Sequence, residues 1–252
     1  MPCILNIETA TEVCSVTVSS DKEVIFQREE TKGPSHAVLL GQFVNDAVKE
    51  LRKNNIRLDA VAVSCGPGSY TGLRIGVSEA KGLCYGLGMP LIAINTLKLM
   101  ANGIIRGEAI DSDVLLCPMI DARRMEVYDV LLNNKLEELR AVSADIIDEN
   151  SFRDFLEKNK VLFFGNGAEK CKLVLNHSNA VFIDGIYPQA INMVDLAEEA
   201  YENKSFVDVA YFEPFYLKEF VATTPKNKVL AMIKKIEELS KESEDSITIE
   251  LK

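Results

Sequence analysis

Four glycines on one predicted helix constrain the fold more than any other feature of this sequence. The run from Ser64 to Gly88 predicts a strand end, a glycine-rich turn over Gly66–Gly72 and a helix over Thr71–Leu87. The helix glycines are Gly72, Gly76, Gly82 and Gly86. Each interior glycine costs a helix about 1 kcal/mol relative to alanine, so an interaction must offset the loss. Close approach of another backbone, from the same chain or from another chain, is the usual reason.

The turn over Gly66–Gly72 is a candidate for phosphate binding, because a strand, a glycine-rich turn and a helix together present backbone N–H groups to an anion. It is not a Walker A loop, which requires a lysine, and Thr71 stands where GxGxxG requires a glycine. The alternative is a structural turn in which Ser69 or Thr71 caps the helix. The residues leave both interpretations open.

A second helix, predicted over Ser35–Leu51, has an apolar stripe that covers about half of its surface, more than the roughly 100° that a core contact needs. A core face combined with an oligomer contact explains both helices, and deep burial within one large core explains them equally well. We predict that the two helices lie side by side and form a joint partner interface. Its candidate residues are Leu39, Leu40, Phe43, Val44, Ala47, Gly72, Ile75, Gly82 and Gly86.

The remaining pattern predicts an α/β protein with two lobes. Strands are predicted at Cys3–Ile7, Cys14–Ser19, Glu23–Arg28, Ala60–Ser64, Pro90–Ile94, Val114–Met119, Glu126–Leu132 and Val161–Phe164. Further helices are predicted at Leu97–Arg106, Phe152–Lys158 and Met193–Asn203. A break near Asp111 divides these elements into residues 1–110 and 111–225. Residues 226–252 form a charged amphipathic tail that either docks on the body or a partner, or stays a solvated terminus.

Charge and composition exclude several classes of function. The formal net charge of the 252 residues is −10. A protein that binds RNA by itself normally carries a basic patch, so if nucleic acid is involved we expect another protein to make most of the contacts with it. No apolar run reaches the roughly 18 residues that span a bilayer, and we expect a cytosolic location without membrane contact. The only histidines, His36 and His177, are far apart in sequence and match no triad or metal motif. We predict no catalytic residue and no metal site.

Several runs resemble one family in the correct order. They are Asn6 to Val16, Gly66-Pro-Gly-Ser-Tyr-Thr-Gly-Leu-Arg-Ile-Gly76, Ile120-Asp-Ala-Arg123, Glu126-Val-Tyr128, Gly165-Asn-Gly-Ala168 and Pro214-Phe-Tyr-Leu-Lys218. This pattern, from about Cys3 to Thr224, resembles the TsaB (YeaZ) proteins of the bacterial machinery that makes N6-threonylcarbamoyladenosine (t6A) in tRNA. One departure from the family pattern is Glu8, where aspartate is usual.

The resemblance implies an ASKHA fold, the actin/Hsp70-like architecture of two ribonuclease-H-like lobes with mixed sheets. It implies a non-catalytic subunit that supports a catalytic paralogue, TsaD, and helps to recruit an ATPase, TsaE. The complex transfers threonylcarbamoyl to adenosine-37 of tRNAs that read ANN codons, so this chain would meet tRNA only indirectly. Without its partner the chain is expected to form a homodimer. The last helix, Met193–Asn203, is expected to pack back on the first lobe.

The resemblance also locates a vestigial nucleotide cleft. Its candidate residues are Glu8, Thr9, Asp121, Gly165 and Gly167. In the catalytic paralogue two histidines bind a metal, and Thr96 and Met100 stand in their places here, so no cofactor is expected in this subunit. The rival hypotheses are a free-standing ASKHA ATPase, an M22-type metallopeptidase and a small-molecule kinase of the same fold.

Overall fold

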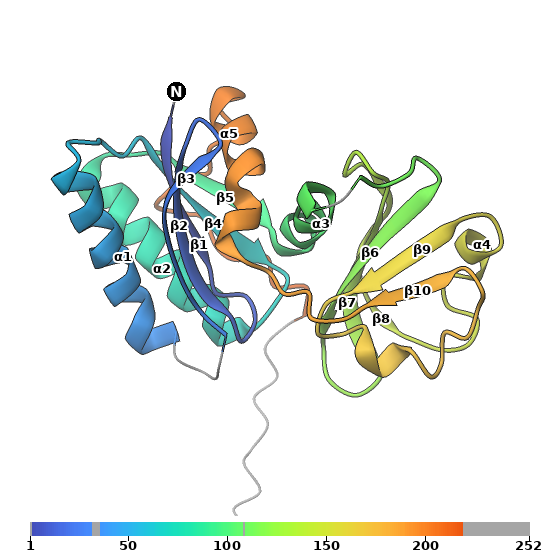
Figure 1. The fold of residues 1–252 in the computed structure, drawn as a ribbon. Helices are drawn as coiled ribbons and strands as arrows, with labels where there is room; N and C mark the ends of the chain where they lie inside the picture. Colours follow the sequence, from blue (N-terminus) through green and yellow to red (C-terminus); the bar gives the residue numbers. More distant parts are fainter. Residues whose placement is uncertain (1, 32–35, 108, 219–252) are drawn as a thin grey trace, which may run out of the picture. The chain divides into compact units, whose positions relative to one another are not determined.

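The computed structural model describes residues 2–31, 36–107 and 109–218 (Figure 1). The predicted tail 226–252, Ser35 at the start of the first predicted helix, and the end of the second predicted lobe at residues 219–225 lie outside the described residues. Residues up to Lys218 form one compact unit that contains two separate β-sheets. The partition at residue 110 therefore stays a prediction about domains, although it does fall between the two sheets.

The first sheet has five strands in the order β3-β2-β1-β4-β5. The strands are β1 (Cys3–Glu8), β2 (Cys14–Ser20), β3 (Glu23–Glu30), β4 (Ala60–Gly66) and β5 (Leu91–Asn95). β1 to β3 form an antiparallel meander, and β4 and β5 continue the sheet in parallel with β1. β1 is buried on both faces, because Ile4 packs into one core cluster while Leu5 and Ile7 pack into another.

The second sheet repeats this topology. Its order is β10-β9-β6-β7-β8, and its strands are β6 (Val114–Asp121), β7 (Glu126–Leu132), β8 (Glu138–Ile146), β9 (Lys160–Phe164) and β10 (Ala180–Ile183). β6 to β8 are again antiparallel, and β9 and β10 are again parallel with β6. The prediction of two lobes with mixed sheets is therefore confirmed, and we call them the first and the second lobe.

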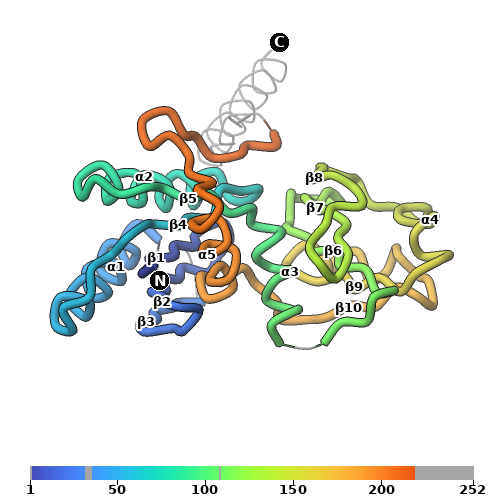
Figure 2. The backbone as a smooth tube through the Cα atoms, turned by 90° about the horizontal axis from the view of Figure 1, so that it is seen from above, coloured from blue at the N-terminus to red at the C-terminus, as the bar shows by residue number. Residues whose placement is uncertain are grey.

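The longer helices belong mainly to the first lobe. They are α1 (His36–Lys53), α2 (Tyr70–Leu87), α3 (Thr96–Gly107) and α5 (Val194–Glu202). α1 and α2 lie side by side on one face of the first sheet, and α5 lies on the other face, where it contacts β1 and β5 (Figures 1 and 2). α3 follows β5 but also contacts β6 and β7 of the second lobe. Each lobe therefore packs against a helix that the chain forms after leaving the other sheet.

The second lobe corrects three sequence predictions. The helix predicted at Phe152–Lys158 is the shorter α4 (Arg153–Leu156). It starts after Phe152 because that residue has a left-handed backbone with φ 62°, which does not belong to a right-handed helix. β8 and β10 were not predicted. The pattern of β8 is half polar because it is an edge strand with exposed positions, and β10 has only four residues, too few for a clear alternation.

Candidate functional site

Glu8, the last residue of β1, is enclosed within the first lobe. Its side chain is fully buried, and Oε1 accepts a hydrogen bond of 2.5 Å from the backbone N–H of Ala10. Burial raises the pKa of Glu8 to about 7, although the hydrogen bond from Ala10 acts in the opposite direction. Oε2 has no hydrogen-bond partner among the described residues. The carboxyl group thus supports the β1–β2 turn, residues 9–13, from inside.

Thr9 in this turn explains two of the four helix glycines. Its hydroxyl donates a hydrogen bond of 2.8 Å to the carbonyl oxygen of Gly72. A Cβ atom on Gly72 would lie 2.1 Å from the Thr9 carbonyl oxygen, and one on Gly76 would lie 2.3 Å from the Thr9 hydroxyl oxygen. Side chains at either position would therefore collide with the turn. For the first half of α2, the close backbone comes from the same chain.

The glycine-rich turn before α2 packs on the same β1–β2 turn. The backbone N–H of Ser69 donates to the Ala10 carbonyl oxygen at 2.7 Å, and a Cβ on Gly68 would lie 2.4 Å from that oxygen. Ser69 caps α2, because its hydroxyl oxygen accepts from the Gly72 N–H at 3.3 Å. The N–H groups of Ser69 and Gly72 are thus engaged within the chain. These contacts favour the structural interpretation of the turn over phosphate binding, with Ser69 rather than Thr71 as the cap.

The glycines of the second lobe also serve a close approach within the chain. Gly165, with φ +103°, would place a Cβ 2.3 Å from the Met119 carbonyl oxygen, and Gly167 would place one 2.8 Å from the Ile120 carbonyl carbon. Both residues lie against the end of β6. Asp121, the last residue of β6, forms an ion pair with Lys170. This carboxylate is therefore neutralised by a lysine of its own lobe.

Asn166, which the sequence reasoning did not single out, connects the two lobes. Its Nδ2 donates to Glu12 Oε2 on the β1–β2 turn at 3.0 Å, and its Oδ1 accepts from the Asp121 N–H at 3.0 Å. The two turns where the resemblance locates a cleft are therefore linked directly. The only feature of the sequence that could have pointed to Asn166 is its position between Gly165 and Gly167, two glycines that allow close packing of the backbone.

The two positions that the resemblance compares with metal ligands belong to the core. Thr96 and Met100 are both fully buried, and the Thr96 hydroxyl oxygen accepts from the Gly66 N–H at 3.1 Å. Among residues 2–31, 36–107 and 109–218, no group of three or more His, Cys, Asp and Glu side chains is arranged to hold a metal ion.

The predicted α1–α2 interface divides into buried and accessible residues. Leu40, Phe43, Val44 and Ala47 pack into the core between α1 and the first sheet. Gly72 lies against Thr9. The sheet beneath α1 covers the apolar stripe that suggested an external contact, and the β1–β2 turn covers Gly72, so these five residues are covered within the chain itself. Leu39 and Ile75 are half-buried. Gly82 and Gly86 are exposed, and no atom lies within 4 Å of a Cβ built on either.

Large apolar side chains are also exposed on both helices. Tyr85 lies one turn from Gly82 on α2 and is 86% exposed, and Leu87 at the end of α2 is 56% exposed. Val38 on α1 is 77% exposed. We define the α1–α2 surface as Val38, Leu39, Ile75, Gly82, Tyr85, Gly86 and Leu87. The sequence prediction missed Val38, Tyr85 and Leu87, although the wide stripe of α1 and the two glycines were signals of the same surface.

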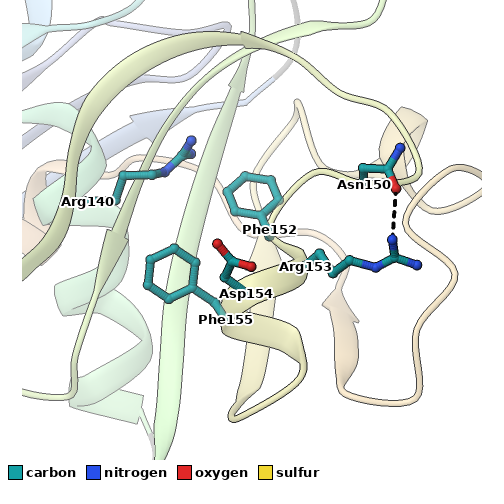
Figure 3. A pocket seen from close by; sticks show the side chains of 6 residues that line it. All are labelled: Arg140, Asn150, Phe152, Arg153, Asp154 and Phe155. Carbon is teal, nitrogen blue, oxygen red and sulfur yellow. Dashed lines mark hydrogen bonds between the residues drawn. The ribbon is translucent and has the colours of Figure 1, made fainter.

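A shallow pocket of about 300 Å³ in the second lobe lies beside α4 (Figure 3). Arg140 of β8 lies 4.6 Å above the Phe152 ring and forms ion pairs with Asp129 and Asp145. Asp129 is fully buried, and burial raises its pKa to about 7 while Arg140 opposes the shift. Arg153 donates to Asn150 Oδ1 at 3.2 Å across the pocket rim. Arg140 is thus paired with two carboxylates and Arg153 is bonded to a neighbouring amide, and we assign the pocket a structural role.

Two sheets of identical β-strand topology, with exchanged helices, define the actin/Hsp70-like (ASKHA) class of protein. Comparison with known proteins identifies the family within this class. The family model of TsaD, tRNA N6-adenosine threonylcarbamoyltransferase, matches residues 29–245. The TsaB protein of Escherichia coli, named as a tRNA threonylcarbamoyladenosine biosynthesis protein, is 30% identical over 227 residues, which cover 87% of this chain and 96% of the relative. TsaB of Bacillus subtilis is 33% identical over 65% of this chain and 70% of the relative. The chain belongs to the TsaB family.

Solved structures agree on the fold. YeaZ from Pseudomonas aeruginosa matches with a TM-score of 0.69 at 24% identity, over 86% of this chain and all of that chain. A second Pseudomonas aeruginosa structure, described as similar to peptidase YEAZ, matches with a TM-score of 0.71 at 23% identity over the same shares. Within the described part of the chain, no helix combines the length and the apolar character needed to cross a membrane.

Proposed function

We propose that this chain is a non-catalytic subunit of the complex that transfers threonylcarbamoyl to adenosine-37 of tRNAs reading ANN codons. It supports a TsaD-type catalytic subunit through the α1–α2 surface. The observation that carries this proposal is the division of the α2 glycines. Gly72 and Gly76 face the chain's own Thr9, whereas Gly82 and Gly86 face open space. The loss of helix stability at the second pair is explained if another chain packs on it.

The cleft residues support a non-catalytic role. Glu8 stands where the family usually has aspartate and is enclosed beneath the β1–β2 turn. The Ser69 N–H that a phosphate would need is bonded to Ala10. Asp121 is paired with Lys170 at the corresponding turn of the second lobe. These arrangements also weigh against the rival hypotheses of a free-standing ATPase, an M22-type metallopeptidase or a small-molecule kinase.

The same proposal covers the wider assembly. The heterodimer recruits a TsaE-type ATPase, this chain meets tRNA as part of the complex, and the reaction takes place in the cytoplasm. In the absence of the TsaD-type subunit, the α1–α2 surface pairs with a second copy of this chain. Exposed apolar surface of this kind is rarely left uncovered, which supports self-association.

Gly82→Leu tests this interface directly. Because no atom lies within 4 Å of a Cβ at Gly82, the larger side chain fits the isolated chain, and its thermal melting should be unchanged or slightly raised. The same side chain would separate the two packed backbones. We expect sedimentation to show a monomer, and we expect co-purification with the TsaD-type subunit to be lost.

Lys158→Leu is the matched control, because Lys158 is an exposed residue of the second lobe outside the α1–α2 surface. It should leave both association reactions intact. A folded Gly82→Leu protein that still dimerises and still binds the TsaD-type subunit would contradict the proposed interface.

A further inference from the structure

The β6–β7 turn carries two arginines in a backbone conformation that arginine rarely adopts. Arg123 has φ 72° and Arg124 has φ 50°. Left-handed backbone costs a residue with a side chain roughly 1–2 kcal/mol, and glycine or asparagine is the usual choice there. Both arginines are exposed. A turn that keeps two unfavourable residues at its tip indicates a role outside folding.

The surroundings of the turn leave these arginines available for an external ligand. The nearby carboxylates are occupied, because Asp121 pairs with Lys170 and Glu126 pairs with Lys218. Neither arginine side chain forms an ion pair or a hydrogen bond with another residue among those the structure describes.

Two lysines lie close to Arg123 and Arg124: Lys170 is paired with Asp121 and Lys218 with Glu126, whereas the two arginines form no ion pair among the described residues. Two unpaired positive charges side by side stand out in a chain with a formal net charge of −10. We call these four residues the cationic turn. Its local field attracts anions, although the chain as a whole repels them.

Aromatic rings border the cationic turn. Tyr216, two residues before Lys218, packs on Tyr70 with ring centroids 4.8 Å apart, and the Arg74 guanidinium lies over the Tyr70 ring. Arg123 and Lys218 both influence the pKa of Tyr128, which places their charges near this phenol. Arginine forks match phosphate oxygens in a bidentate manner, and cations combined with aromatic rings are typical of nucleic-acid contacts.

We propose that the cationic turn binds the phosphate backbone of tRNA within the assembled complex. This inference rests on the proposed function, which supplies the tRNA, and it goes beyond it by giving this subunit a direct contact. Two free arginines contact about two phosphates, which is too few to hold tRNA against the chain's own negative charge. The isolated chain should therefore show no measurable tRNA binding at physiological salt, whereas the complex uses the turn to position its substrate.

The test is the salt dependence of tRNA binding by the complex of this chain with its TsaD-type subunit. The slope of log K against log salt is negative, and each lost phosphate contact makes it less steep by about 0.7–0.9. Arg123→Asn combined with Arg124→Asn should reduce the steepness by about 1.4–1.8, with a similar effect on every tRNA sequence. Asparagine tolerates left-handed backbone, so the variant should melt no lower than the parent protein.

Lys158→Gln combined with Lys160→Gln is the matched control. Both lysines are exposed in the same lobe, and Lys160 pairs with Val114 at the end of β6 opposite Asp121. The control should leave the slope unchanged. An unchanged slope for the arginine variant in an active complex overturns this inference alone. Failure of the chain to join any TsaD-type subunit overturns the proposed function and this inference with it. A third outcome is also possible: the variant weakens binding of poly-glutamate to the complex but leaves tRNA binding unchanged. The cationic turn would then bind an acidic protein segment, and the proposal would be overturned.

Discussion

Gly72→Ala should destabilise the protein by about 3 kcal/mol. The new Cβ would lie 2.1 Å from the Thr9 carbonyl oxygen, a backbone atom that cannot rotate away. The turn is also held by the Ser69–Ala10 hydrogen bond and by Glu8, so relief requires several contacts to shift together. Overpacking of this kind typically costs 1–3 kcal/mol and occasionally more. Denaturant unfolding monitored by circular dichroism measures the change.

Gly82→Ala is the matched control on the same helix. Its Cβ meets no atom within 4 Å, and the loss of an exposed interior glycine should stabilise α2 by up to about 1 kcal/mol. Identical substitutions ten residues apart should therefore change the free energy of unfolding in opposite directions. Equal effects at the two positions would show that the β1–β2 turn does not pack on α2 as described.

Glu8→Gln should make stability less dependent on pH. Burial raises the pKa of Glu8 from 4.5 to about 7 in the folded protein, so the folded state holds a proton that the unfolded state has already released. Stability from this group is present below pH 4.5 and is lost as the pH rises through 7, by about 3 kcal/mol at most. Glutamine mimics the protonated form and can still accept from Ala10.

Unfolding free energies at pH 5 and pH 8 measure this effect. Between pH 5 and pH 8, the stability advantage of Glu8→Gln over the parent protein should grow by about 2.5 kcal/mol, because a smaller part of the effect is already present at pH 5. Glu12→Gln is a control at an exposed residue of the same turn. A difference that is independent of pH would mean that Glu8 is ionised without penalty in the folded protein.

The helix glycines illustrate how much the sequence can predict. Their number indicated correctly that backbone must approach α2 closely, since nothing else offsets the loss of helix stability. Which chain supplies that backbone depends on tertiary contacts. The structure gives one answer for Gly72 and Gly76, which face Thr9, and leaves open space at Gly82 and Gly86.

Other misses have related physical causes. The apolar stripe of α1 is wider than the periodicity of a surface helix predicts, and this suggested an external contact. The structure shows that the sheet beneath α1 buries Leu40, Phe43 and Val44 of this stripe. Asn166 is a single amide whose role depends on Glu12, more than 150 residues earlier in the chain. Such a long-range contact leaves no periodic signal. β1 and β4 of the first lobe were predictable because each is a short, mostly apolar segment whose residues are almost all buried.

The family comparison and the geometry complement each other. The model that matches the chain describes a transferase, whereas the curated relatives are named as biosynthesis proteins. The residues predicted to line a vestigial cleft make contacts within the chain: Thr9 donates to the Gly72 carbonyl oxygen, and Asp121 pairs with Lys170. The proposed loss of catalysis and the proposed docking surface thus both involve α2. Its first half packs against the β1–β2 turn, and its second half is open.

Reconstitution of t6A synthesis tests the central proposal most directly. The purified chain, its TsaD-type and TsaE-type partners, threonylcarbamoyl-adenylate and tRNA are combined, and modified adenosine is measured with each protein omitted in turn. The chain alone should form no t6A and should hydrolyse ATP far below the usual enzyme range of about 1–1000 per second. Adding it to the TsaD-type subunit should restore modification, and Gly82→Leu should abolish that gain. Modification by the chain alone, or full activity of the partners without it, would contradict the account.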